Sequence, residues 1–198
     1  MIEDQVSNRI FTVPNLISFA RLAAVPVFWW LLLGRDRVGA ATVLLIIVSW
    51  TDWVDGYLAR RFDQVTKLGK ALDPIADRLM IASAVVAGLT TEIVPWVVGV
   101  PLLVRELYMT AITLVLAVRK RPPLEVRYLG KLATFVVYGS IHSFYIAAVP
   151  FLEDLFRPIA WVTSVTGLLL YWIVAFQYTG DARSALTELE SGAILEES

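Results

Sequence analysis

Four aspartates within residues 52–77 carry the most informative chemistry of this sequence. Asp52 and Asp55 stand three positions apart, and Asp73 and Asp77 stand four positions apart. On helices, these spacings place the members of each pair on one face. Carboxylates are costly near a bilayer, so a cluster of them needs a binding partner. Because Mg²⁺ prefers oxygen ligands and can act in pairs between carboxylates and phosphates, the spacing predicts a site for two Mg²⁺ or Mn²⁺ ions.

Small residues and one arginine accompany the aspartates. Gly56 and Ala59 follow the first pair, and Gly69 precedes the second pair by one turn. These residues leave little side-chain bulk where a flat or phosphorylated ligand would approach the backbone. Arg60 lies on the same predicted helix as the first pair, and a guanidinium can hold phosphate with two hydrogen bonds. The stretch therefore predicts a diphosphate substrate that binds together with its metal ions.

This arrangement resembles the CDP-alcohol phosphatidyltransferase family, whose motif is D-x-x-D-G-x-x-A-R, a spacer of eight residues, then G-x-x-x-D-x-x-x-D. The fixed positions of the motif are all occupied here, by Asp52, Asp55, Gly56, Ala59, Arg60, Gly69, Asp73 and Asp77. A motif with this many fixed positions and an intact spacer is a specific signal. The similarity also includes P-N-L-I-S-F-A-R-L at 14–22, the Arg105-Glu106 pair and Y-L-G-K at 128–131.

The resemblance implies a reaction and a role for each residue of the motif. Family members transfer a group from a CDP-linked lipid, here CDP-diacylglycerol, to an alcohol, and CMP leaves. The aspartates would hold the metal ions, with Asp77 also acting as general base toward the acceptor hydroxyl. The residues expected to bind CDP-diacylglycerol are Gly56, Ala59, Arg60 and Gly69. No nucleophilic side chain is implied, so a single displacement is expected.

The acceptor alcohol is less clearly specified. The resemblance favours the branch whose acceptor is glycerol 3-phosphate, and a sister branch uses the lipid phosphatidylglycerol and forms cardiolipin. Arg105 and Lys131 match family positions near the acceptor, where cations would bind phosphate. Arg105 can instead form a structural ion pair with Glu106 inside the membrane.

Two further sets of polar residues lie within predicted spans. Asn15, Ser18 and Arg21, on the first span, are weaker candidates for the same cavity, with helix packing as the alternative. His142 is the only histidine, and it has no second imidazole or nearby carboxylate in the sequence. We therefore expect it to be a hydrogen-bonded packing residue.

Composition independently indicates an integral membrane protein. The 198 residues are 58% hydrophobic and 18% charged, with a mean hydropathy of +0.68, which is too apolar for a soluble domain. Apolar stretches predict an all-α protein with six transmembrane helices, and the family resemblance implies a polar, metal-binding cavity open to the cytoplasmic side. The expected spans are 14–34, 38–60, 69–91, 94–118, 128–150 and 157–180.

The remaining expectations concern location, organisation and partners. Basic residues gather at 61–70 and 119–127, which places the motif on the cytoplasmic face of the cell membrane. Residues 1–183 are expected to form one membrane domain, and 184–198 an acidic, mobile tail. The family implies a homodimer; membrane lipid is an expected partner and nucleic acid is not. A small cation transporter remains the non-enzyme alternative, since intramembrane acids can also carry ions.

Overall fold

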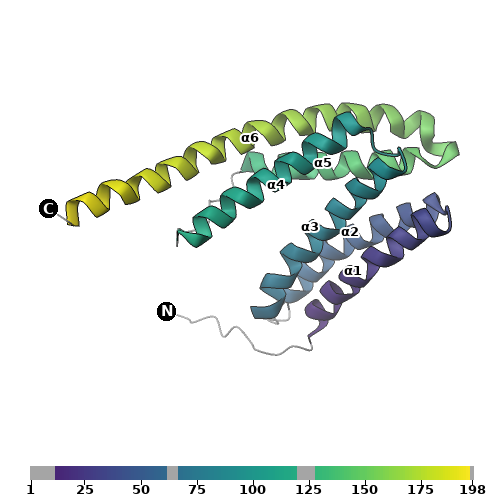
Figure 1. Cartoon of the computed structure of the whole chain (residues 1–198). Helices are drawn as coiled ribbons and strands as arrows, with labels where there is room; N and C mark the ends of the chain where they lie inside the picture. The colour runs from purple at the N-terminus through teal and green to yellow at the C-terminus, as the bar shows by residue number, and fades with distance from the viewer. Residues whose placement is uncertain (1–11, 62–66, 120–127, 197–198) are drawn as a thin grey trace.

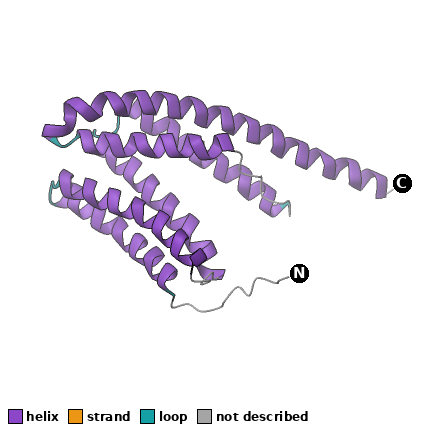
Figure 2. Ribbon diagram, turned by 180° about the vertical axis from the view of Figure 1, so that it is seen from behind, coloured by secondary structure: helices purple, strands orange, loops and turns teal. Residues whose placement is uncertain are grey.

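The computed structural model describes residues 12–61, 67–119 and 128–196, and side chains within 12, 15–51, 75–119 and 128–184. Within these ranges all regular elements are helical, which confirms the predicted all-α class (Figure 2). The elements are α1 (Val13–Trp29), η1 (Trp30–Gly34), α2 (Val38–Arg61), α3 (Lys67–Thr90), α4 (Trp96–Val118), α5 (Tyr128–Ala147), η2 (Pro150–Leu152) and α6 (Glu153–Glu196).

The first five long helices begin and end close to the spans expected from hydropathy, whereas α6 does not. The sequence predicted a span at 157–180, but α6 covers Glu153–Glu196. A hydropathy window finds the apolar part of a helix, while the chain after residue 180 continues with good helix formers such as alanine, leucine and glutamate. The domain boundary expected at residue 183 therefore lies inside a continuous helix, and the mobility of 184–198 stays a prediction.

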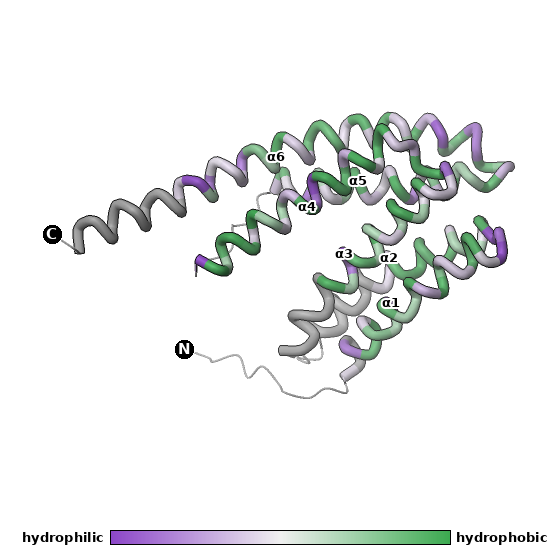
Figure 3. Tube along the Cα trace, viewed as in Figure 1, coloured by the Kyte–Doolittle hydropathy of each residue, from purple (hydrophilic) through white to green (hydrophobic). Residues whose placement is uncertain are grey.

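Three described helical stretches are long and apolar enough to cross a membrane: Asn15–Gly34, Trp96–Val118 and Pro150–Ser184. A shorter apolar run, Val38–Thr51, lies in α2. Figure 3 shows hydrophobic residues along most of the length of the described helices, as expected for a membrane protein. These features indicate a membrane protein; the crossing of the membrane by all six long helices stays a prediction.

The helices form two groups (Figure 1). In one group α1 packs against α2 and α3, and in the other α6 packs along α5 and against α4. Contacts between the groups are sparser and run from α3 to α4 and from α2 and α3 to α5. Figures 1 and 2 both show the groups meeting near the α3–α4 turn and diverging from there. The molecule therefore has a closed end and an open end.

The closed end is joined around Tyr145, a fully buried residue of α5. Its hydroxyl donates to the backbone oxygen of Ala84 on α3 at 2.7 Å, and its ring meets the edge of Phe28 on α1, with centroids 5.6 Å apart. Thr42 of α2 donates to the backbone oxygen of Tyr145 at 3.1 Å. One side chain and its backbone thus link four helices, which fixes both groups at this end.

Gly88 allows the close approach of α3 and the α3–α4 turn at the closed end. A Cβ atom at this position would lie 2.4 Å from Cγ2 of Val94 and 3.2 Å from the hydroxyl of Tyr145. The first distance is far inside van der Waals contact, so any larger residue must displace its neighbours. The C-terminal part of α2 and the first turns of α3, which carry the aspartate motif, lie at the open end.

Candidate active site

Asp77 is the motif aspartate whose side chain the structure describes. It lies on the face of α3 that meets α1, where Arg21 forms an ion pair with its Oδ1. The Arg21 side chain is 1% exposed and that of Asp77 is 30% exposed. A buried arginine needs a charged partner, and the pair holds the Asp77 carboxylate at one position. Asp77 is thus both fixed and reachable, as a general base or metal ligand must be.

The other motif residues occupy helical backbone positions. Asp52, Asp55, Gly56, Ala59 and Arg60 fall in α2, and Gly69 and Asp73 in α3. The helical spacing assumed from the sequence is therefore correct. Their side chains lie outside the described ones, so the predicted metal site and the binding roles stay predictions. The donor chemistry of the four aspartates, all carboxylate oxygens, fits a hard divalent cation.

A small cavity of about 50 Å³ lies beside Asp77, lined also by Arg21, Ser49, Ile81 and Tyr138. Its volume holds little more than a water molecule or one hydroxyl group. The cavity shares lining residues with two larger apolar grooves, the first between α2 and α5 and the second between α3 and α4, both where the two helix groups face each other. Tyr138 lines all three spaces.

The first groove, of about 710 Å³, runs between α2 and α5. Ser49 and His142 form a polar part of its wall, with the Oγ of Ser49 and the Nε2 of His142 2.8 Å apart. The Nδ1 of His142 lies 2.6 Å from the backbone oxygen of Tyr138 and donates to it, because a carbonyl oxygen can only accept. The prediction that His142 is a hydrogen-bonded packing residue is confirmed.

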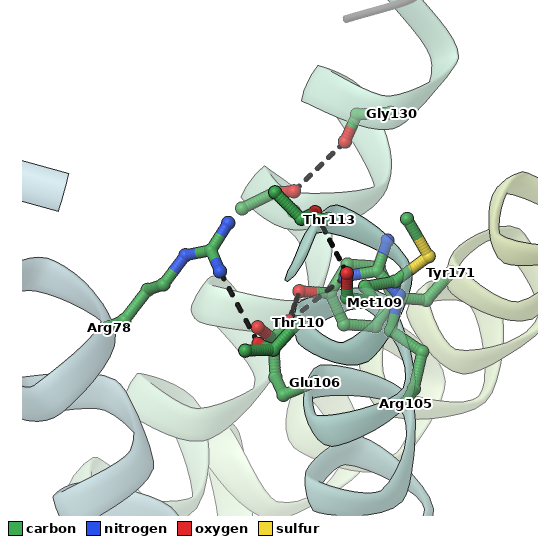
Figure 4. Close-up of polar contacts among 9 residues, drawn as sticks. Arg78, Arg105, Glu106, Met109, Thr110, Thr113, Gly130 and Tyr171 are labelled. Atoms are coloured by element: carbon green, nitrogen blue, oxygen red, sulfur yellow. Dashed lines mark hydrogen bonds and ion pairs between the residues drawn. The ribbon is translucent and has the colours of Figure 1, made fainter. Parts of the chain in front are cut away.

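Arg105 belongs to a compact cluster between α4 and α6 (Figure 4). It is 8% exposed, its Nη1 donates to Oε1 of Glu106 at 3.0 Å, and its guanidinium lies 3.5 Å from the ring centre of Tyr171. The Tyr171 hydroxyl donates to the same Glu106 oxygen. Within the described residues, the Nε of Arg105 is buried without a hydrogen-bond partner. The ion pair considered from the sequence is therefore present.

Lys131, the second residue expected to bind the acceptor, is exposed in the first turn of α5. The described contacts of Arg105 are with Glu106 and Tyr171. The acceptor role of Arg105 and Lys131 stays a prediction.

Sequence reasoning underestimated Arg21 and missed Tyr138 and Arg78. Asn15, Ser18 and Arg21 are all buried on α1, and Arg21 pairs with Asp77 from 56 positions away. Its signal in the sequence was a charged residue inside an apolar span, which always requires a partner. Arg78 directly follows Asp77 and points from α3 toward α4, as Figure 4 shows. Nothing in the sequence distinguished Tyr138 from other aromatic residues in the spans.

Comparisons with known proteins identify the family of this chain. The family model described as CDP-alcohol phosphatidyltransferase matches residues 11–176. A CMP-forming cardiolipin synthase of Streptomyces coelicolor is 36% identical over 183 residues, which is 89% of this chain and 85% of the relative.

Two relatives of a second kind are also similar. A CDP-diacylglycerol–glycerol-3-phosphate 3-phosphatidyltransferase of Bacillus subtilis is 35% identical, covering 72% of this chain and 80% of its own. The enzyme of the same name from Shigella flexneri is 31% identical, covering 90% and 98%. Family membership favours an enzyme over the cation transporter. Because the family model covers most of its length and its relatives are similar over most of theirs, this chain belongs to the CDP-alcohol phosphatidyltransferase family.

Proposed function

We propose that this protein transfers the phosphatidyl group of CDP-diacylglycerol to the hydroxyl of a glycerol-containing acceptor and releases CMP. The observation that carries the proposal is Asp77, held by Arg21 at a small cavity that shares lining residues with two apolar grooves. A lipid substrate needs apolar walls for its chains, and the transfer needs a base at their inner end. The names of the relatives support the same donor.

The chain's own residues supply most of the proposed mechanism. Bound Mg²⁺, held by Asp52, Asp55, Asp73 and Asp77, would neutralise the diphosphate and stabilise charge on the attacking and leaving oxygens. The Asp77 carboxylate takes the proton of the acceptor hydroxyl. Arg21 keeps that carboxylate directed toward the cavity.

The donor is proposed to bind along α2. Gly56, Ala59 and Gly69 allow the cytidine and ribose to lie against backbone, and Arg60 binds phosphate. The groove between α2 and α5 starts on the same helix as the first aspartate pair, and its apolar walls suit the acyl chains of the donor. The diacylglycerol part would thus remain in contact with the bilayer during transfer.

Two acceptors share the required chemistry, a glycerol hydroxyl near a phosphate. Glycerol 3-phosphate was the first expectation from the sequence, with Arg105 and Lys131 as its cations. Arg105 is already paired with Glu106 and stacked on Tyr171, which reduces its value for a dianionic acceptor. Phosphatidylglycerol carries a single charge and brings acyl chains, and the second groove provides an apolar surface for them.

The surroundings of the site are part of the same proposal. We propose that the end carrying the aspartate motif lies on the cytoplasmic face of the cell membrane. Basic residues gather in the sequence at 61–70 and 119–127, and an excess of lysine and arginine is typical of cytoplasmic loops. A homodimer is proposed from the family resemblance.

The proposal is tested by CMP release from CDP-diacylglycerol by purified protein in detergent or nanodiscs. Activity is expected with Mg²⁺ or Mn²⁺ and lost in excess chelator. Asp55→Asn and Asp73→Asn should each abolish it while the protein remains monodisperse, because each loses a ligand charge. Full turnover in chelator, or in both variants, would contradict the metal-dependent mechanism.

A further inference from the structure

Ser49 of α2 lines two of the spaces described above. It belongs to the wall of the first groove, where its Oγ lies 2.8 Å from Nε2 of His142. It also lines the cavity of about 50 Å³ at Asp77. Since liquid water occupies about 30 Å³ per molecule, this cavity fits hydroxyl groups, whereas a phosphate group or an acyl chain is too large for it. Ser49 and the proposed base can therefore both contact one small polar group placed there.

The hydroxyl proton of Ser49 is directed into the protein. It has two acceptors there, the backbone oxygen of Leu45 at 2.9 Å and Nε2 of His142. The imidazole is itself fixed, because its Nδ1 donates to the backbone oxygen of Tyr138. A hydroxyl oxygen has two lone pairs in addition to its proton. Toward a substrate, Ser49 is therefore an acceptor of a hydrogen bond.

Two acceptors thus line one cavity of hydroxyl size, the Asp77 carboxylate and the Ser49 hydroxyl oxygen. Arg21 pairs with Asp77, whose side chain stays 30% exposed. A simple alcohol has one hydroxyl proton and would use only one of these acceptors. A 1,2-diol has two hydroxyl protons on neighbouring carbons and can donate one to each. The glycerol end of both acceptors considered above is such a diol.

We infer that Ser49 binds the hydroxyl next to the reacting one, so that this site selects acceptors with a 1,2-diol. The inference rests on the proposed function, and it applies to glycerol 3-phosphate and phosphatidylglycerol alike. The terminal hydroxyl gives its proton to Asp77, and its oxygen forms a bond to the phosphorus that bears the diacylglycerol. The bond from that phosphorus to the CMP oxygen breaks, and CMP leaves with the electron pair. The neighbouring hydroxyl keeps its proton and donates a hydrogen bond to Ser49, which orients the reacting hydroxyl.

The first test compares each diol with the analogue that lacks its middle hydroxyl. The full chain, in phosphatidylcholine nanodiscs with CDP-diacylglycerol and Mg²⁺, receives glycerol 3-phosphate or 3-hydroxypropyl phosphate. Separate arms receive phosphatidylglycerol or phosphatidyl-1,3-propanediol. The arm in which the diol releases CMP identifies the source of the acceptor. In that arm kcat/KM should be about three- to tenfold lower for the analogue, the effect of one hydrogen bond.

The outcomes of this comparison separate the inference from the proposed function. Equal kcat/KM values for diol and analogue would overturn the inference and leave the proposed function intact. Absence of CMP release in every arm would contradict the proposed function, and this inference with it. The comparison needs only the wild-type protein, so it decides the matter even where a variant does not fold.

Ser49→Ala tests whether the preference belongs to this side chain. The variant should lower kcat/KM for the diol by the same factor and leave the value for the analogue nearly unchanged, so the two acceptors become equivalent. A purely structural role, in joining α2 to α5, would lower both values together and keep the preference. The matched control is Ser143→Ala on α5. Its hydroxyl donates to the backbone oxygen of Gly139 at 2.8 Å, and Ser143 does not line the cavity, so this variant should keep the preference.

Two results of the variant would overturn the assignment to Ser49. The first is a diol preference that persists in Ser49→Ala, because the second hydroxyl would then bind elsewhere. The second is a higher KM for CDP-diacylglycerol with an unchanged preference. Ser49 would then serve the first groove, which is proposed for the donor, and not the acceptor.

Discussion

The closed end and the open end of the molecule are built from the same six long helices but by different means. At the closed end, Tyr145 joins α5 to α1, α2 and α3 through a ring contact and backbone hydrogen bonds. At the open end, the groups separate, and the charged pair of Arg21 and Asp77 lies beside a cavity and two grooves. Apolar packing there is interrupted by these spaces, which we propose as substrate sites.

The contrast shows how a membrane enzyme can accommodate charged and bulky substrates without losing its fold. Stability can come from small residues and hydrogen bonds at one end, where helices approach closely. Function can then use the other end, where polar groups and spaces would otherwise weaken packing. Changes at the closed end should alter unfolding, and changes at the open end should alter turnover.

The largest expected effect is at the open end, for Asp77→Asn. Loss of the base should lower kcat by about 10²- to 10⁴-fold. The asparagine oxygen can still accept from Arg21, but the buried guanidinium loses its counter-charge, so the unfolding temperature should also fall, while the KM for CDP-diacylglycerol should be nearly preserved. CMP release and donor binding provide the measurements. Donor binding lost as severely as in Asp55→Asn would show that Asp77 acts chiefly as a metal ligand.

At the closed end, Gly88→Ala should have a smaller effect, on stability and not on activity. The added Cβ lies 2.4 Å from Val94, a residue that is 1% exposed. Overpacking of this kind costs about 1–3 kcal/mol, so the unfolding temperature should fall while the KM values of the folded fraction remain unchanged. Gly39→Ala is the control, since a Cβ there meets nothing within 4 Å. Equal unfolding temperatures of Gly88→Ala and Gly39→Ala would refute the close approach of Gly88 to Val94.

Tyr145→Phe should weaken the closed end more gently. The ring contact with Phe28 is kept, but the backbone oxygen of Ala84 loses its 2.7 Å hydrogen bond from the hydroxyl. Hydrogen bonds between membrane helices contribute about 0.6–1.7 kcal/mol. Denaturant unfolding in detergent should detect a loss in that range, with kcat unchanged. A large loss of kcat without a loss of stability would mean that Tyr145, at the closed end, also influences turnover at the open end.

The smallest effect should come from Arg157→Gln in the first turns of α6. Arg157 donates to Glu153 at 2.8 Å, and both side chains are about half exposed. Exposed pairs with this helical spacing contribute about 0.3–0.5 kcal/mol. Unfolding and CMP release should therefore both match the wild-type protein. A measurable change in turnover would show that the closed end does influence the reaction.

Sequence reasoning predicted the helices better than their contacts. The spans expected from hydropathy lie close to α1 to α5 because the apolar runs of this sequence form helices, and the solitary His142 was correctly predicted to be hydrogen-bonded. The ion pair of Arg21 and Asp77 could not be predicted, because it depends on how α1 crosses α3. The same holds for the grooves, whose shapes result from the divergence of the two groups. The full length of α6 was not predicted, because hydropathy detects the apolar part of a helix and not its polar continuation.

The length of α6 has a mechanical consequence. Its 44 residues correspond to about 66 Å of helix, whereas the hydrocarbon core of a bilayer is about 30 Å thick. Since α6 runs from the closed end past the motif end, a span upright in the membrane would emerge into water still coiled. The emerging part would continue as helix in water beside the open end, beyond the lipid surface.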